Sequence, residues 1–209
     1  MIEQLACRLG RNDEVPNIEL ARLLCESENE NGIREIAEGL RSSDTAVAND
    51  CIKVLYEIGE SKPELIAGYT EDFINALSSS NNRIVWGSMK ALSRVAPLRP
   101  EAVFKRLPEV ITAYTKGSVI TRDNSISVFA ALCAAQESYR HTIFPLLLEH
   151  IAGCRAKEIP QHAERIVVCL ESGTRQAFVA ALEKRKHEMT ETQNKRIDKL
   201  IQQVAGGNV

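Results

Sequence analysis

Residues 99–114 read RPEAVFKRLPEVITAY, a helical pattern with a proline in its middle. The apolar positions that share one face of this helix are Val103, Leu107, Val110, Ile111 and Tyr114. Pro108 interrupts them, and a proline inside a helix removes a backbone donor and clashes with the preceding turn, at a cost of about 3 kcal/mol. The stretch therefore predicts either one helix kinked at Pro108 or two short helices that meet there.

The same pattern recurs along the chain with a period of 37 residues. Pro63 recurs as Pro100, and Pro108 recurs as Pro145. The apolar positions in the same register of successive copies are Leu40, Leu77, Tyr114 and Ile151. A single helical hairpin cannot bury its apolar stripe, so the copies are expected to stack on one another and share a core. No sustained alternation of apolar and polar residues indicates strands.

A second helix follows the first in each copy. VANDCIKVLYEIG at 47–59 matches IVWGSMKALSRVA at 84–96, a third copy begins at Asn124, and a fourth lies around 164–170. The third copy is offset by 40 residues and the fourth by 38. Small insertions of this kind fall in loops when helical hairpins stack.

These residues resemble the HEAT repeat of the HEAT/armadillo class over about residues 31–154. The matching apolar and small positions of the second helices are Val47, Cys51, Ile52, Val54, Leu55, Ile58, Ile84, Ser88, Met89, Ala91, Leu92 and Val95. The resemblance implies an all-α right-handed superhelix of about four to five helical hairpins, with first helices kinked at proline. It also implies an Asp–Arg ladder between repeats, but Ala48, Arg83 and Arg122 break that pattern, so a continuous ladder is not expected.

We assign residues 1–209 to a single HEAT-like domain. Residues 1–30 form an N-terminal cap with helices at 2–10 and 17–27, residues 31–154 form the core repeats, and residues 155–209 form a divergent repeat and a C-terminal cap. The last hairpin is expected at 174–187 and 190–204, with Thr190 or Thr192 capping its second helix. Its sparse apolar residues suit a terminal repeat, whose outer face must be polar.

Charge is distributed unevenly along the chain. The net charge is −2, but residues 1–80 carry 7 basic and 16 acidic side chains, a net charge of −9. Residues 81–154 carry 9 and 5, and residues 155–209 carry 10 and 7, giving +4 and +3. In an elongated array such a gradient influences the choice of partner.

The six cysteines are scattered without a C-x-x-C pair, and most lie on apolar helical stripes. This usage predicts reduced, buried thiols in a cytoplasmic protein. Neither a membrane span nor a secretion signal is indicated.

Candidate chemistry is sparse. Glu149–His150 and His187–Glu188 lie one period apart, and some HEAT-like hydroxylases bind iron through His–Glu pairs on successive repeats, but only one of these pairs has the His–Glu order. We therefore interpret His150 and His187 as solvated residues at helix ends and His162 as a packed core residue. We expect no metal, no cofactor and no catalytic residues, because no nucleophile or phosphate-binding motif occurs.

The outward positions of the second helices are the predicted partner-binding surface, because the resemblance places these helices on the concave face. These positions are Asn49, Lys53, Tyr56, Glu57, Trp86, Lys90, Arg94 and Ile126. Trp86 is either a half-exposed binding anchor or a side chain that packs sideways on a neighbouring repeat. The apolar residues Ile126 and Ala130 would give the groove an apolar middle, as suits a peptide or helix of another protein.

The first functional hypothesis is a non-catalytic scaffold that binds a protein partner along the concave face. An alternative is a nucleic-acid-binding repair protein of the HEAT-like glycosylase type that would use the basic C-terminal region. Another is a HEAT-like modifying enzyme or lyase subunit. The acidic N-terminal third would repel a phosphate backbone, which argues against nucleic acid as the partner. The sequence leaves the oligomeric state open.

Overall fold

The chain folds into α-helices. The computed structural model describes residues 1–206, and in that range it contains twelve α-helices and no strand. The α-helices are α1 (Val15–Ser27), α2 (Glu30–Glu38), α3 (Thr45–Ser61), α4 (Thr70–Ala76), α5 (Asn82–Val95), α6 (Pro100–Lys105), α7 (Leu107–Lys116), α8 (Val119–Ala135), α9 (Glu137–Gly153), α10 (Ile159–Ile166), α11 (Ser172–Arg185) and α12 (Glu191–Ala205). The all-α prediction is confirmed.

Short 3-10 helices join several of these elements. They are η1 (Ile2–Gln4), η2 (Gly39–Arg41), η3 (Pro63–Leu65), η4 (Ala67–Tyr69), η5 (Ala156–Glu158), η6 (Val167–Cys169) and η7 (Lys186–Glu188). No helix among the described residues is long and apolar enough to cross a membrane.

The chain divides into two compact units, Met1–Val128 and a second unit that starts at Phe129. The boundary falls inside α8, so this helix contributes residues to both units. The sequence placed the internal boundaries of the domain after residues 30 and 154, and the observed boundary after Val128 coincides with neither. The assignment of the whole chain to one domain stays a prediction.

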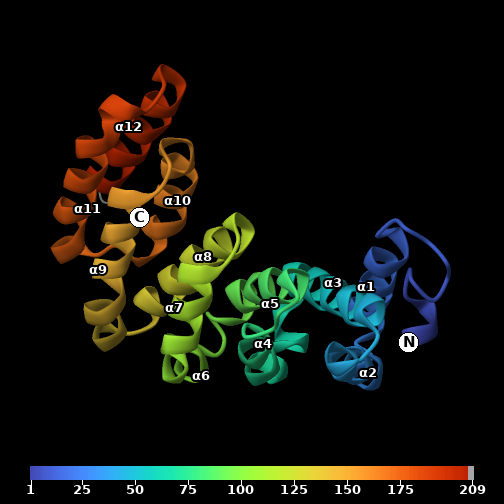
Figure 1. The fold of residues 1–209 in the computed structure, drawn as a ribbon. Helices are drawn as coiled ribbons and strands as arrows, with labels where there is room; N and C mark the ends of the chain where they lie inside the picture. Colours follow the sequence, from blue (N-terminus) through green and yellow to red (C-terminus); the bar gives the residue numbers. More distant parts are fainter. Residues whose placement is uncertain (207–209) are drawn as a thin grey trace. The chain divides into compact units, whose positions relative to one another are not determined.

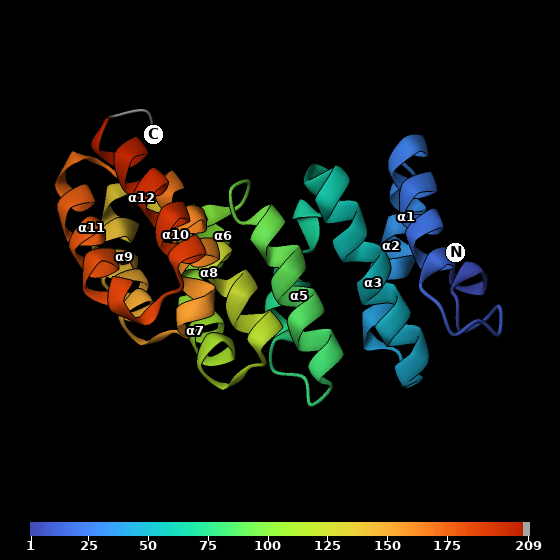
Figure 2. The ribbon, with the colours of Figure 1, turned by 90° about the horizontal axis from the view of Figure 1, so that it is seen from above.

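In the first unit the helices form two layers. Helices α1, α3 and α5 lie side by side in one layer, whereas α2 packs against α3, and α4 against α5 and α6, in the other (Figures 1 and 2). Ten of the seventeen residues of α3 are buried, because this helix has neighbours on both sides and beneath it. Gly87 allows the close approach of α5 to α3, since a Cβ there would lie 2.6 Å from Ile52 Cγ1.

In the second unit, helix α9 packs on α11, α10 packs on both α9 and α12, and α11 packs on α12. The last hairpin occupies α11 and α12, close to the expected ranges. Of the two candidate caps, Thr190 begins α12 in a capping box with Gln193.

The two prolines at 37-residue spacing have different structural effects. The chain breaks between α6 and α7, and Pro108 is the second residue of α7. Because the first backbone N–H groups of a helix have no partner within the helix, the missing donor of Pro108 is inexpensive there. Pro145, by contrast, lies inside the continuous helix α9. Residues 99–114 therefore form two short helices and not one kinked helix.

The N-terminal cap differs from its prediction. Residues 2–10 form η1 followed by turns, so the helix expected there is wrong. Side chains from outside the segment satisfy its backbone instead: Asn17 Oδ1 accepts from Ala6 N at 3.0 Å, and Asp50 Oδ2 accepts from Cys7 N at 2.8 Å. The helix expected at 17–27 begins two residues earlier, at Val15.

A ladder of capping residues marks the starts of α3, α5 and α8 at the 37-residue period. Asp44 Oδ1 accepts from Ala46 N, Asn81 Oδ1 from Arg83 N and Ser118 Oγ from Thr121 N, at 3.0, 3.0 and 3.3 Å. Short polar side chains at these positions satisfy backbone donors that have no partner in the helix. The resemblance to the HEAT repeat implied an Asp–Arg ladder in these turns and did not indicate this capping role.

Candidate partner-binding face

The exposed side of the layer formed by α1, α3 and α5 carries most of the predicted site residues. We call this surface the partner-binding face and define it by Glu14, Lys53, Tyr56, Glu57, Glu60, Arg83, Trp86, Lys90 and Arg94. Lys53, Tyr56 and Glu57 come from α3, and Trp86, Lys90 and Arg94 from α5. Helices α3 and α5 pack directly against one another (Figure 2). Side chains from both helices therefore contribute to one surface.

Lys53 is the centre of an ion-pair network. Its side chain is 7% exposed, and Nζ lies 2.9 Å from Glu14 Oε2 and 2.7 Å from Glu57 Oε1. Glu14 also pairs with Arg83. A buried ammonium needs such partners, because the loss of its hydration is otherwise uncompensated.

The network shifts the pKa values of its members in opposite directions. The hydrogen bond from Lys53 holds the pKa of Glu14 below its ordinary value of 4.5, against the opposing effect of burial. Burial disfavours the charged form of Lys53, but hydrogen bonds to Glu57 and Glu14 outweigh that effect and raise the pKa of Lys53. Both groups are therefore charged at neutral pH.

An aromatic pair lies next to this network. The rings of Tyr56 and Trp86 are 5.5 Å apart and inclined at 44°, a tilted arrangement that stabilises by about 0.5–1.5 kcal/mol beyond burial. The Lys90 ammonium lies 4.2 Å from the centre of the Tyr56 ring, and the Arg83 guanidinium lies 5.7 Å from the Trp86 ring. Tyr56 is only 3% exposed, whereas Trp86 remains half-buried.

Trp86 therefore combines the two alternatives considered for it. It packs sideways on α3, the second helix of the preceding repeat, and it still presents part of its ring to solvent. At the far end of the face, Glu60 pairs with Arg94 and lies 3.4 Å from Lys90 Nζ.

Two predicted residues have other roles. Asn49 is half-buried, and its Oδ1 accepts a hydrogen bond of 2.8 Å from Asn81 Nδ2, which ties α3 to the start of α5. Ile126 is fully buried, so its placement on an outward-facing groove is wrong. Ile126 lies on the buried side of α8 together with Phe129, Ala130 and Cys133, so Ala130 does not line an outward-facing groove either.

Sequence reasoning missed Glu14, Glu60 and Arg83 as members of the face. Glu14 precedes α1 and comes from outside the repeats that were aligned, so helical spacing could not place it beside Lys53.

A pocket of about 470 Å³ adjoins Glu14 and Arg83 and is also lined by Asp13, Asn49 and Asp50. A larger pocket of about 690 Å³ lies on the other layer, next to Pro108.

The histidines differ from their predicted roles. His162 is buried, as expected, but His150 is also buried, so its interpretation as a solvated residue is wrong. The side chain of His187 is exposed, as expected, and its Nε2 lies 3.9 Å from Glu188 Oε1. Of the six cysteines, four are buried and Cys7 and Cys154 are half-buried.

Comparison with solved structures defines the class of the fold. The chain is similar to an engineered protein (TM-score 0.64, 17% identity, 99% of this chain and 97% of that one) and to the designed armadillo repeat protein YIII(Dq)4CqI (TM-score 0.65, 12% identity, 98% and 100%). It is also similar to the designed armadillo repeat protein YIII(Dq.V1)4CPAF in complex with peptide (KR)4 (TM-score 0.66, 11% identity, 90% of each chain).

The fold is thus that of the armadillo/HEAT-like α-helical repeat proteins, and the resemblance inferred from the sequence is confirmed at the level of the fold. No family model matches the sequence, and no curated protein matches it either.

Proposed function

We propose that this protein is a non-catalytic interaction module that binds a segment of a partner protein on the partner-binding face. The observation that carries the proposal is the half-buried Trp86, held by Tyr56 and surrounded by ion pairs. Aromatic side chains with a charged rim are typical anchors of protein interfaces, because they bury a large area at a low entropic cost. The similar designed protein in complex with peptide (KR)4 shows that an armadillo repeat fold can hold a peptide.

The charge of the face favours a protein over a nucleic acid. Its three carboxylates (Glu14, Glu57, Glu60) are paired with its four cations (Lys53, Arg83, Lys90, Arg94). A phosphate backbone needs an excess of uncompensated cations, and this face offers almost none. A protein segment with an apolar side chain for Trp86 and charges of both signs fits the surface better.

The test compares the proteins that wild type and variants capture from native lysate. Trp86→Ala and Lys90→Glu alter the partner-binding face. The control variants Tyr114→Ala on α7 and Lys105→Glu on α6 likewise remove an aromatic ring and reverse a charge, but outside that face. We expect at least one protein to be captured by the wild type and both controls but lost by both face variants. If the face variants capture everything that the wild type does, the proposal is wrong.

A direct measurement follows with the purified partner. Trp86 is the only tryptophan of the chain, so its fluorescence reports on this face alone. Saturable change in its emission on addition of the partner is the expected result. Affinity for duplex DNA that falls steeply with salt would instead support the nucleic-acid hypothesis.

A further inference from the structure

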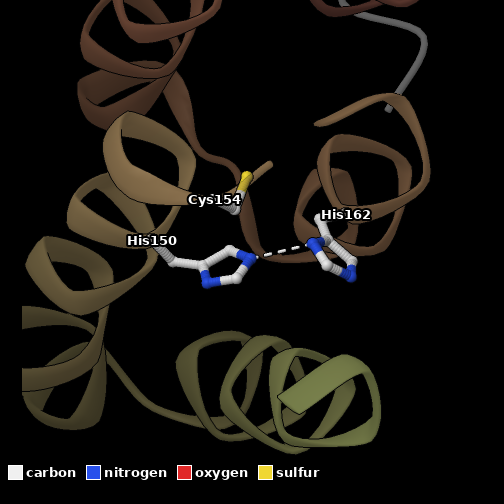
Figure 3. A group of neighbouring side chains, drawn as sticks. All are labelled: His150, Cys154 and His162. Atoms are coloured by element: carbon white, nitrogen blue, oxygen red, sulfur yellow. Dashed lines mark hydrogen bonds between the residues drawn. The ribbon is translucent and has the colours of Figure 1, made fainter. Parts of the chain in front are cut away.

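Three side chains capable of binding a metal gather where α9 turns into α10. His150 lies in the last turn of α9, Cys154 is the residue that ends this helix one turn later, and His162 lies in α10. One ligand atom from each of the three lies within 4.8 Å of the other two. Figure 3 shows the imidazoles of His150 and His162 pointing toward one another from the two helices, with Cys154 beside them.

The distances are close to those of a tetrahedral metal site. His150 Nε2 and His162 Nδ1 are 2.8 Å apart and share a hydrogen bond. Zinc–nitrogen bonds of about 2.0–2.1 Å and zinc–sulfur bonds of about 2.3 Å require ligand atoms roughly 3.3–3.6 Å apart. Binding of an ion would therefore require the imidazoles to separate slightly and the sulfur to move inward.

The surroundings hold the ligands in place. His150 is 7% exposed and His162 is 1% exposed, so neither ring moves freely, whereas the half-buried Cys154 leaves a path for an ion to enter. The Arg185 guanidinium donates hydrogen bonds to the carbonyl oxygens of Ile151, Ala152 and Cys154 at 2.6, 2.7 and 2.9 Å. These bonds fix the end of α9 and thereby the position of Cys154, as outer-shell partners do in metal sites.

The donor set indicates the class of metal. Two imidazoles and one thiolate suit zinc and similar borderline transition-metal ions, whereas magnesium and calcium require oxygen ligands. A tetrahedral ion with three protein ligands keeps a fourth position for water. Cys154 coordinates as the thiolate, so its proton passes to solvent when the ion binds.

We propose that His150, Cys154 and His162 bind one divalent zinc-type ion that fastens α9 to α10. The site shares no residue with the partner-binding face, because its three ligands all belong to the second unit. Without an ion, His150 Nε2 and His162 Nδ1 share a hydrogen bond of 2.8 Å. The ion-bound and ion-free forms should differ in their absorption with Co²⁺ and in the reactivity of the Cys154 thiol.

Cobalt(II) is the spectroscopic probe. Chelator-treated protein titrated with Co²⁺ is expected to develop visible bands of tetrahedral cobalt and a near-ultraviolet thiolate-to-cobalt band, saturating at one ion per chain and reversed by Zn²⁺. Cys154→Ser should lose the thiolate band, and His162→Gln should lose the visible bands. Cys7→Ser and His141→Gln change the other half-buried cysteine and an exposed histidine, and they should behave as the wild type.

Thiol labelling gives a second measurement that does not depend on the folding of a histidine variant. In the Cys7→Ser background, Cys154 is the one half-buried cysteine that remains, since the other four are buried. We expect Zn²⁺ to slow its reaction with a thiol reagent at least tenfold. An unchanged labelling rate, or cobalt bands that survive in Cys154→Ser, would overturn the proposal.

Discussion

At the scale of single residues, the chemistry of the partner-binding face depends on one buried lysine. The Lys53 ammonium is nearly excluded from water, so its charge is stabilised by Glu14 and Glu57 rather than by hydration. Glu14 also holds Arg83, and Arg83 lies over Trp86. Trp86, the proposed binding anchor, is therefore positioned by an electrostatic network that begins outside the repeats.

The effect of pH on Glu14 follows from its lowered pKa. Because the folded-state pKa lies below the ordinary value of 4.5, the stabilisation by Glu14 is complete above that value and is lost as the pH falls through the lowered pKa. We expect Glu14→Gln to lower the free energy of unfolding by about 1 kcal/mol at pH 7, a modest value because the Glu14 side chain is 43% exposed.

Urea unfolding at pH 7, 5 and 3 measures this difference. The gap between wild type and Glu14→Gln should be constant from pH 7 to 5 and should shrink at pH 3, whereas the exposed control Glu38→Gln should differ little from the wild type throughout. A gap that widens toward pH 3 would contradict the assignment.

At the scale of elements, one sequence feature leads to two local structures. Pro108 starts α7, where its ring suits the first turn, whereas Pro145 interrupts the hydrogen-bond ladder of α9. The repeat pattern places both prolines at the same position. The local backbone decides whether the helix ends or continues through the proline.

Alanine substitutions should distinguish the proline at the start of α7 from the proline inside α9. Pro108→Ala is expected to lower the free energy of unfolding by about 0.4–1 kcal/mol, because the unfolded chain gains freedom and the fold gains no hydrogen bond. Pro145→Ala is expected to raise it by about 1–3 kcal/mol, because a backbone donor to the His141 carbonyl returns. Urea denaturation of both variants measures whether the free energy of unfolding falls or rises in each. Destabilisation by Pro145→Ala would show that α9 needs its proline for packing.

At the scale of the whole molecule, stability is expected to differ from helix to helix, because in repeat proteins each repeat contacts only its neighbours. Within the first unit, α3 contacts α1, α2 and α5, whereas α1 contacts α2 and α3. In the first unit, α3 is buried on three sides, whereas α1 has five buried residues among thirteen. Within the first unit, α3 should therefore open last.

Hydrogen exchange tests this order. Amides of α3 should exchange with a free energy close to that of global unfolding, and amides of residues 1–14 and α12 should exchange through smaller local openings. Mass spectrometry of peptides from these segments gives the protection of each. Equal protection of α3 and α12 would show that the whole chain unfolds as one cooperative unit.

The sequence by itself determined the helical class, the repeat period and most of the helices, because the apolar spacing and the prolines are local signals. It also placed Tyr56, Trp86 and Lys90 on one surface, since helical periodicity fixes which residues share a face. It did not locate Glu14 or Arg83 beside Lys53, and it wrongly placed Ile126 on the outside.

Only the tertiary structure decided which charges meet and which histidines approach each other. The spacing of His150 and Cys154, four residues apart, is readable as one helical face, but the position of His162 depends on how the chain returns through η5 into α10. Ion pairs and metal ligands form between segments whose sequence separation follows no period. Their contacts are set by the packing of whole helices, which local spacing does not encode.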